Sequence, residues 1–334
     1  MTGGKNTQYQ KYGIEIEMTG LTRNRAARVA GQFFGATAMH VGGTYDAYTV
    51  VDRQRRTWKL VSDSSIITTT TNGQPAGNLY AVECVSPICQ YRDIETIQKL
   101  AVALQEAGAI TNPRCGIHVH VDASRHTPQT LRNLVNIVAS KEDLLYKALQ
   151  VDVLRESYCE KTNARFLDAI NRYKPNTMSQ LKRIWYNGYD GSQHHYDSTR
   201  YHCLNLHSVF SKGTIEFRLF NSTLDPQHIK AYIQLCLAIS NQALVQKFAS
   251  PVRTQSTNEK YTFRTWLLRL GLIGDEFKEA RACLLEHLEG NIAWKDPAQA
   301  EAQKQRLAER ARLEQAQQQQ RQDESPAFSM SQLG

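Results

Sequence analysis

Four short segments of the chain alternate polar and apolar residues, and this alternation constrains the fold more than any other feature. The segments are YGIEIEM (12–18), LYAVECVSP (79–87), CGIHVHVD (115–122) and GTIEFRLF (213–220). Alternation is typical of β-strands, because successive side chains point to opposite faces of a sheet. The apolar residues of each strand are numerous enough to form the core side. The sequence therefore predicts an α+β fold, with a mainly antiparallel sheet and helices packed on the apolar face.

The opposite face of these strands carries charge and imidazoles. Its residues are Glu15, Glu17, Glu83, His118, His120, Asp122, Glu216 and Arg218. A strand face exposed to solvent more often carries Lys, Thr, Gln and Ser. Carboxylates that face one another repel, and their pKa values rise unless a cation compensates. Mg²⁺ suits oxygen-rich clusters, whereas Zn²⁺ more often has three His or Cys ligands. From the residues alone a zinc site, a magnesium site with phosphate and a polar patch of ion pairs remain open.

The remaining elements follow from periodicity and from turn and cap residues. We expect short strands within 37–63 and helices over 23–34, 93–109, 127–149 and 225–248, with two short helices in 160–185 and two more before 288. The first alternating residues after the loop 186–200 predict a strand over 201–210, joined by a tight turn at 211–213 to the strand 213–220.

Composition divides the chain into four parts. Residues 1–11 are expected to be a disordered leader, 12–295 one globular domain, 296–322 a charged helix and 323–334 a disordered tail. The segment 296–322 is rich in Ala, Gln, Glu and Arg and has almost no apolar stripe, so it is expected to be a solvated arm that can bind a protein partner.

Charge and cysteine content exclude several classes of protein. The net charge of +8 fits anionic substrates such as nucleotides but does not by itself indicate nucleic acid, which we do not expect as a partner. No apolar run has membrane-spanning length, so no membrane association is expected. The seven cysteines are scattered without a CxxC pair. They indicate free thiols and a cytoplasmic protein.

The order of the motifs resembles the amidoligase branch of the carboxylate–amine ligase superfamily, which also contains glutamine synthetase and glutamate–cysteine ligase. The resemblance rests on YGIEIEM, VECVSP, CGIHVHVD and GTIEFRLFNSTLDP and spans about 12–244. It implies a curved antiparallel sheet whose concave face binds ATP and two or more Mg²⁺ or Mn²⁺ ions. One difference is the short run 112–116, which replaces the glycine- and asparagine-rich run of glutamine synthetase, so the resemblance does not indicate glutamate as substrate.

The resemblance also implies roles for individual residues. Glu15, His118 and Glu216 match ligands of the metal that bridges the ATP phosphates, Glu17 and Glu83 match ligands of a metal nearer the substrates, and Asp63 resembles an additional acid of some members. Arg218 matches an arginine that contacts the transferring phosphoryl group, and Arg200 resembles a basic residue of the phosphate or substrate site. His120 lies on the same face and is assigned either to phosphate or substrate contact or to a supporting position.

These roles imply an ATP-dependent ligase that joins a carboxylate to an amine through an acyl phosphate, on small-molecule, peptide or protein substrates. Three alternatives remain. A zinc or dinuclear hydrolase could use HxHxD with His194, His195, His202 or His207. A guanidino-kinase-like phosphotransferase would use the same fold. A non-catalytic binding protein would need a basic sheet face, and these strand motifs are acidic. No P-loop and no strand-linked GxGxxG motif is present.

A truncation tests the expectation for the C-terminal segment. Removing the residues after Asp296 should leave the thermal midpoint of the remaining chain and its nucleotide-dependent activity unchanged, because the segment has no apolar face to complete a core. Differential scanning calorimetry of both forms measures this, and a joint loss of stability and activity would contradict it.

Overall fold

The computed structural model describes residues 7–323 of the chain. Residues 1–6 of the expected leader and 324–334 of the expected tail lie outside this range. Two compact units are present. The first comprises the chain up to Thr254 together with Thr265–Leu288, and the second comprises Gln255–Arg264 and the chain from Glu289 onward. This division differs from the expected boundary at residue 296. Every candidate site residue lies in the first unit.

An eight-stranded sheet forms the centre of the first unit, with strand order β2-β3-β4-β5-β1-β6-β8-β7. Each pair of named neighbours is antiparallel. The strands are β1 (Tyr12–Met18), β2 (Met39–Gly42), β3 (Ala47–Val51), β4 (Thr57–Val61), β5 (Val82–Val85), β6 (Gly116–Asp122), β7 (Leu204–Asn205) and β8 (Thr214–Asn221). The α+β class and the antiparallel sheet are confirmed, and the alternating segments form β1, β5, β6 and β8.

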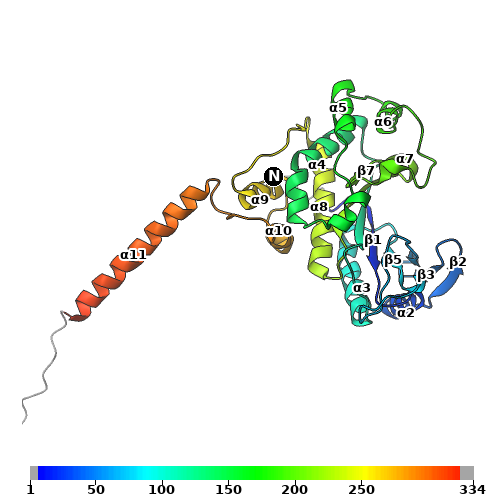
Figure 1. Ribbon diagram of the computed structural model, residues 1–334, viewed down its shortest axis with the longest axis horizontal. Helices are drawn as coiled ribbons and strands as arrows, with labels where there is room; N and C mark the ends of the chain where they lie inside the picture. The colour runs from blue at the N-terminus through cyan, green and yellow to red at the C-terminus, as the bar shows by residue number, and fades with distance from the viewer. Residues whose placement is uncertain (1–6, 324–334) are drawn as a thin grey trace, which may run out of the picture. The chain divides into compact units, whose positions relative to one another are not determined.

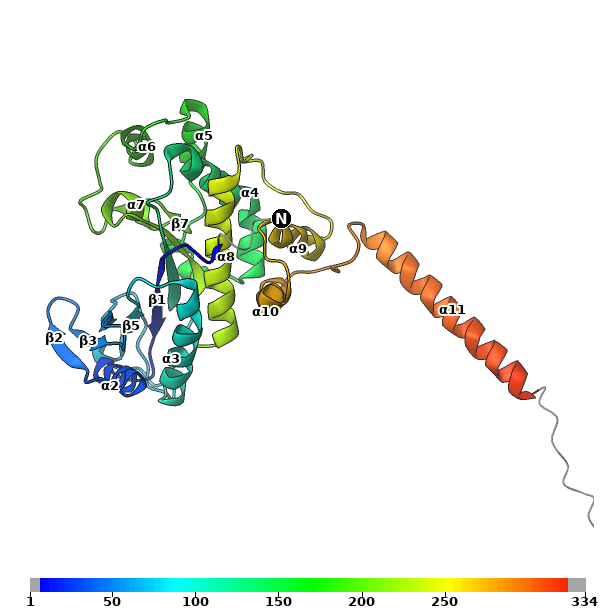
Figure 2. The same cartoon turned by 180° about the vertical axis from the view of Figure 1, so that it is seen from behind.

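Helices cover the apolar side of the sheet. They are α2 (Arg23–Phe34), α3 (Ile94–Glu106), α4 (Pro128–Ala148) and α8 (Pro226–Val245). Both views show α3, α4 and α8 beside the sheet, and α8 packs against α3, α4, α10 (Lys278–Leu285) and β6 (Figures 1 and 2). Within residues 7–323, none of the helices combines the length and the apolarity needed to cross a bilayer.

The starts of the two long helices follow from their caps. Thr127 accepts a hydrogen bond from the Thr130 amide at the start of α4. The Asp225 carboxylate accepts hydrogen bonds from the Gln227 and His228 amides at the start of α8. A proline occupies the first turn of each helix, where its missing N–H costs nothing. These local signals explain why both starts are predictable from sequence.

The remaining helices occur where the sequence predicts them. They are α5 (Ala164–Tyr173) and α6 (Met178–Trp185) after the 3₁₀-helix η3 (Val153–Tyr158), then α9 (Glu259–Arg269) and α10, and finally α11 (Pro297–Asp323). In the second unit the Asn258 side-chain amide donates to the Trp294 carbonyl at 2.6 Å.

The prediction of a strand over 201–210 is correct only for two residues near its centre. Only Leu204 and Asn205 form β7, and His207–Ser211 form the short helix α7. The Asn205 side-chain oxygen accepts the His207 amide at 2.8 Å and ends the strand, as asparagine often does at turns. The neighbouring strands are therefore connected by α7 and not by a tight turn.

The expected leader does not extend to residue 11. The Gln10 side chain is buried, donates to the Leu237 carbonyl at 2.7 Å and accepts from the Ser240 hydroxyl at 2.6 Å. Two hydrogen bonds to α8 thus hold the chain immediately before β1.

The polar side of the central strands is also covered. Glu17, His118, Glu216 and Arg218 are each at most 5% exposed. Part of the cover is η3, because a side chain at Gly116 would collide with the guanidinium of Arg155. The expectation that only the apolar face is covered is therefore incomplete.

A pair of phenylalanine substitutions tests the position of the core. Phe217 on β8 is 1% exposed, whereas Phe248 is 62% exposed. Phe217→Ala should lower the free energy of unfolding by about 3–5 kcal/mol, the cost of a large cavity in a packed interior. Phe248→Ala should change it by less than about 0.5 kcal/mol. Urea unfolding measures both, and equal effects would contradict the assigned core.

Candidate metal and phosphate site

The register of the central strands brings acids and imidazoles together. The opposed pairs are Glu17 with Glu83 on β1 and β5, Glu15 with His118 on β1 and β6, and His120 with Glu216 on β6 and β8. Residues directly opposite on one sheet face have side chains within reach of each other, and like charges there destabilise the pair. The sheet therefore assembles side chains that are 66 to 103 residues apart in the chain.

Three groups of these side chains have ligand atoms within 4.8 Å of one another. The groups are Glu15 with Glu83 and His118, Glu15 with His120 and Glu216, and Glu17 with Asp63 and Glu83. Because Glu15 belongs to two groups and Glu83 to two, the three form one continuous cluster across β5, β1, β6 and β8. We call these seven residues the carboxylate cluster.

Glu15 is held between the two histidines. Its Oε2 lies 3.1 Å from Nδ1 of His118, and its Oε1 lies 3.2 Å from Nε2 of His120. Burial tends to raise the pKa of Glu15, but His120 and His118 outweigh it, so the pKa is well below its usual range. Glu15 is therefore ionised at neutral pH.

The two histidines differ in their surroundings. Burial, together with the charge of Arg218, lowers the pKa of His118 to about 4. Burial tends to lower the pKa of His120 as well, but the neighbouring Glu15 and Glu216 raise it above its usual value. Neutral His118 is in the form that binds metals.

The second nitrogen of His120 supports a ligand role. Its Nδ1 lies 3.1 Å from the Thr214 hydroxyl, which fixes the ring. Its Nε2 is buried and lacks a hydrogen bond of acceptable geometry among the described residues. A buried nitrogen that points at Glu15 and Glu216 fits a cation between the three side chains.

Glu17 and Glu83 are the two members of the carboxylate cluster whose carboxyl pKa values are raised. Burial, followed by the charge of Asp63, raises the pKa of Glu17 to about 8, although the Gly116 amide donates to its Oε2 at 2.6 Å. Burial, Glu15 and Glu17 raise the pKa of Glu83 well above its usual range. Asp63 lies at the edge, where its Oδ1 accepts hydrogen bonds from Ser65. These oxygens suit a hard divalent cation.

Arg218 is paired with Glu216. Its Nη1 lies 2.5 Å from Glu216 Oε1, and its Nε donates to the Tyr158 carbonyl at 3.3 Å. The other oxygen of Glu216 accepts from the Asn205 amide and the Ser208 hydroxyl, both at 2.7 Å. The ion-pair interpretation left open by the sequence thus describes this contact, and Arg218 remains beside the carboxylate cluster.

The three groups found in the structure assign the metal-ligating residues to ions differently from the family resemblance. The resemblance places Glu15, His118 and Glu216 on one metal, whereas the group that contains Glu216 has His120 as its imidazole. His118 Nδ1 lies 3.9 Å from Glu216 Oε1, so it remains adjacent. Asp63, which resembles an additional acid of some family members, joins Glu17 and Glu83.

Arg200 lies outside the carboxylate cluster. It belongs to the loop before β7, donates from Nη1 to the His195 carbonyl at 2.8 Å, and stacks near the rings of Tyr196 and Tyr201. It nevertheless lines the same cavity of about 230 Å³ as Glu216.

Two cavities reach the carboxylate cluster. One of about 400 Å³ is bordered by Glu15 and His120, and the cavity of about 230 Å³ is bordered by Glu216. Lys212, in the connection between α7 and β8, lines both cavities and places its Nζ 3.9 Å from Glu15 Oε1.

Sequence reasoning missed Lys212, Arg155, Asn205 and Ser208. Lys212 was assigned only to a turn. Asn205 could have been found, since it follows the alternation of the neighbouring motifs. Nothing in the sequence around Arg155 indicates that its guanidinium donates to the carbonyls of Arg218 and Phe220, because only the fold brings them together.

Comparisons with known proteins give the family of the chain but do not test the individual site residues. The family described as "Putative amidoligase enzyme" matches residues 8–240. No curated protein is significantly similar to the chain. The crystal structure of a bifunctional glutathione synthetase from Pasteurella multocida is similar over 85% of this chain and 48% of that chain, at 12% identity and a TM-score of 0.36. The chain spans about half the length of that protein.

The raised pKa of Glu17 predicts a pH-dependent stability. In the protein freed of metal by a chelator, this carboxyl binds its proton more tightly when folded, with a pKa of about 8 against 4.5. Its contribution to stability is therefore full below pH 4.5 and is lost as the pH rises to 8, by on the order of 5 kcal/mol. Glu83 acts in the same direction. Urea unfolding between pH 5 and 8 measures this loss.

Glu17→Gln provides the matching test. The variant should show a smaller loss of stability over this pH range and bind Mg²⁺ at least about tenfold more weakly, since it lacks the charged oxygen. Glu95→Gln, at a side chain 73% exposed on α3, is the control and should behave as wild type. Wild-type Mg²⁺ affinity in Glu17→Gln would remove Glu17 from the site.

Proposed function

We propose that this chain, which belongs to the putative amidoligase family, is an ATP-dependent ligase that forms an amide bond between a carboxylate and an amine. The observation that carries the proposal is the carboxylate cluster, in which buried and half-buried acids and histidines have ligand atoms within 4.8 Å of one another in each group. Such a cluster needs cations, and Mg–ATP supplies cations together with the phosphates that complete their coordination. The motif resemblance extends the proposal to the carboxylate–amine ligase superfamily.

The donor set fits two divalent ions. Glu17, Asp63 and Glu83 would hold one, and Glu15 with His120 and Glu216 the other, with His118 between them. Mg²⁺ or Mn²⁺ bound there would neutralise charge on the ATP phosphates and on the migrating phosphoryl group.

The reaction explains why ATP is needed. A carboxylate has a poor leaving group, so its oxygen first attacks the γ-phosphorus of ATP, and ADP leaves. The amine nitrogen then attacks the carbonyl carbon of the acyl phosphate, loses a proton, and phosphate leaves with the original carboxylate oxygen. This sequence needs no covalent nucleophile from the protein. It needs in-line positioning and charge stabilisation.

The chain's own cations suit the second requirement. Arg218 lies beside the carboxylate cluster, paired with Glu216, and Lys212 borders both cavities. Arg200 borders the cavity that contains Glu216. Two cavities that share Lys212 as a lining residue also fit a reaction that brings a nucleotide and a second substrate close together.

The position of Asp122 argues against the hydrolase alternative. This third residue of HxHxD belongs to none of the metal-capable groups found within residues 7–323. Its two carboxylate oxygens accept hydrogen bonds from the Ser124 amide and hydroxyl, each at 2.9 Å. His194, His195, His202 and His207 are likewise absent from those groups.

A product-based screen tests the function. With Mg²⁺ and ATP, one acid–amine pair should yield ADP, phosphate and a condensed product lighter than the two reactants by one water, as identified by mass spectrometry. Phosphate release should require both partners. A stable phosphorylated product would instead indicate a phosphotransferase, and zinc-dependent cleavage without nucleotide would indicate a hydrolase.

Arg218→Lys tests the role of the guanidinium. Lysine retains the charge but loses the planar fork that matches two oxygens. Turnover should fall on the order of 10²-fold or more, the scale of losing one preorganised charge-stabilising donor, while ATP affinity largely remains. Arg28→Lys, at an exposed position of α2, is the control and should be neutral. A lower thermal midpoint with unchanged turnover per folded molecule would show that Arg218 is only a structural partner of Glu216.

A further inference from the structure

A third cavity, of about 290 Å³, lies on the opposite side of β7 from the carboxylate cluster. Leu204 lines it, whereas the next residue, Asn205, points to Glu216. Leu204 pairs with Phe217 of the apolar core, so the cavity belongs to the helix-covered side at the edge of the sheet. The sites described above include none of its lining residues.

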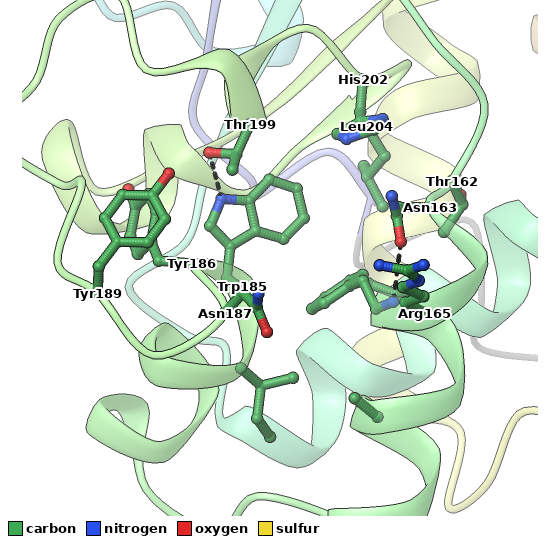
Figure 3. A pocket seen from close by; sticks show the side chains of 14 residues that line it. Thr162, Asn163, Arg165, Trp185, Tyr186, Asn187, Tyr189, Thr199, His202 and Leu204 are labelled. Carbon is green, nitrogen blue, oxygen red and sulfur yellow. Dashed lines mark hydrogen bonds between the residues drawn. The ribbon is translucent and has the colours of Figure 1, made fainter.

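Aromatic and apolar side chains form the walls. Figure 3 shows the Trp185 indole beside the open space, with Tyr186 and Tyr189 on one side of it and Asn163 and Arg165 across the space. Phe166 packs edge-on against Trp185, with ring centroids 4.8 Å apart at 86°. The indole nitrogen donates to the Thr199 hydroxyl at 2.9 Å (Figure 3). The indole is thus held in place by two other residues of the cavity wall.

The rim of the cavity is polar and carries no acid. Its polar residues are Thr162, Asn163, Arg165, Asn187, Thr199 and His202. Arg165 is exposed and forms no ion pair with any residue of the described range. His202 lies with Nδ1 3.1 Å from the Lys161 carbonyl, which assigns the proton to that nitrogen and leaves Nε2 as an acceptor. An unpaired guanidinium without a competing carboxylate favours an anion.

We infer that this cavity binds a planar aromatic ring that carries a carboxylate or phosphate. The walls supply ring contacts, since aromatic groups prefer edge-to-face and offset stacking on one another. The volume is at the lower end of ligand pockets and fits one ring system. The guanidinium of Arg165 at the rim supplies the contact to the anionic group. The inference does not depend on the proposed ligase function.

A ligand in this cavity would lie next to a residue that contacts the cavity containing Glu216. Tyr186 lines the cavity and is fully buried. Its hydroxyl lies 2.6 Å from Nδ1 of His207, and His207 lines the cavity that contains Glu216. The ring-binding cavity is therefore separate from the carboxylate cluster. Its wall residue Tyr186 contacts His207, which lines the cavity that contains Glu216.

Calorimetric titration of the full chain tests the inference, in a chelator so that no metal takes part. The probes are indole-3-acetate, AMP and the neutral 3-methylindole. At least one anionic probe should bind, and indole-3-acetate should bind up to about fivefold more tightly than 3-methylindole, the scale of an exposed ion pair. Binding of AMP or of indole-3-acetate then identifies the source of the ring as a nucleotide or an aromatic acid.

Two variants locate the binding. Ala169→Leu adds bulk inside the cavity and should weaken binding by about tenfold or more, because a packed space tolerates extra methylenes poorly. Arg165→Gln should remove the preference for the anionic probe, and Arg172→Gln, at an exposed position of the same helix, should keep it.

The outcome that overturns the inference is specific. It fails if neither anionic probe binds to the wild-type chain at millimolar concentration. It also fails if the bound probe is unaffected by both Ala169→Leu and Arg165→Gln, since the probe then occupies another site. Neither result bears on ligase activity, which the metal-dependent product screen measures separately.

Discussion

Glu17 and Glu83 stand directly opposite each other on β1 and β5, both largely shielded from water, with Glu15 and Asp63 close by. Carboxylates this close together repel, and burial raises the pKa of Glu17 and of Glu83. Positively charged or hydrogen-bonding partners stabilise two of the acids in this region. His118 and His120 stabilise the charge of Glu15, and Arg218 stabilises that of Glu216. No arginine or lysine of the described residues forms an ion pair with Glu17 or Glu83, so a cation bound at the proposed site would relieve the repulsion of this pair most.

The surrounding structure holds this arrangement in place. Gly116 provides its amide to Glu17 and leaves room for Arg155, whose guanidinium binds two carbonyls of β8. Those carbonyls lie beside the register shift between β6 and β8. On the apolar side α8 packs on β6, α2 packs on β3 and β4, and α3 and α4 pack on α8, so the positions of the acids follow from core packing as well as from their own contacts.

The sequence predicted most of what depends on local pattern. Alternation identified β1, β5, β6 and β8, and Thr127 and Asp225 with their following prolines identified the starts of α4 and α8. The strand expected over 201–210 failed because the Asn205 side chain captures the His207 amide, a contact that periodicity does not reveal. The parity of each strand also predicted which side chains share a face. The pairing of His120 with Glu216, the position of Lys212 and the role of Arg155 depend on strand order and register, which a single sequence does not specify.

The fate of one oxygen atom tests the central claim most directly. A carboxylate substrate labelled with ¹⁸O is turned over with ATP and Mg²⁺, and the released phosphate is analysed by mass spectrometry. An acyl-phosphate ligase transfers one labelled oxygen from the acid to phosphate, and the amide keeps the other. Unlabelled phosphate, which takes its new oxygen from water while the acid retains both of its labelled oxygens, would contradict the ligase account and show hydrolysis of ATP.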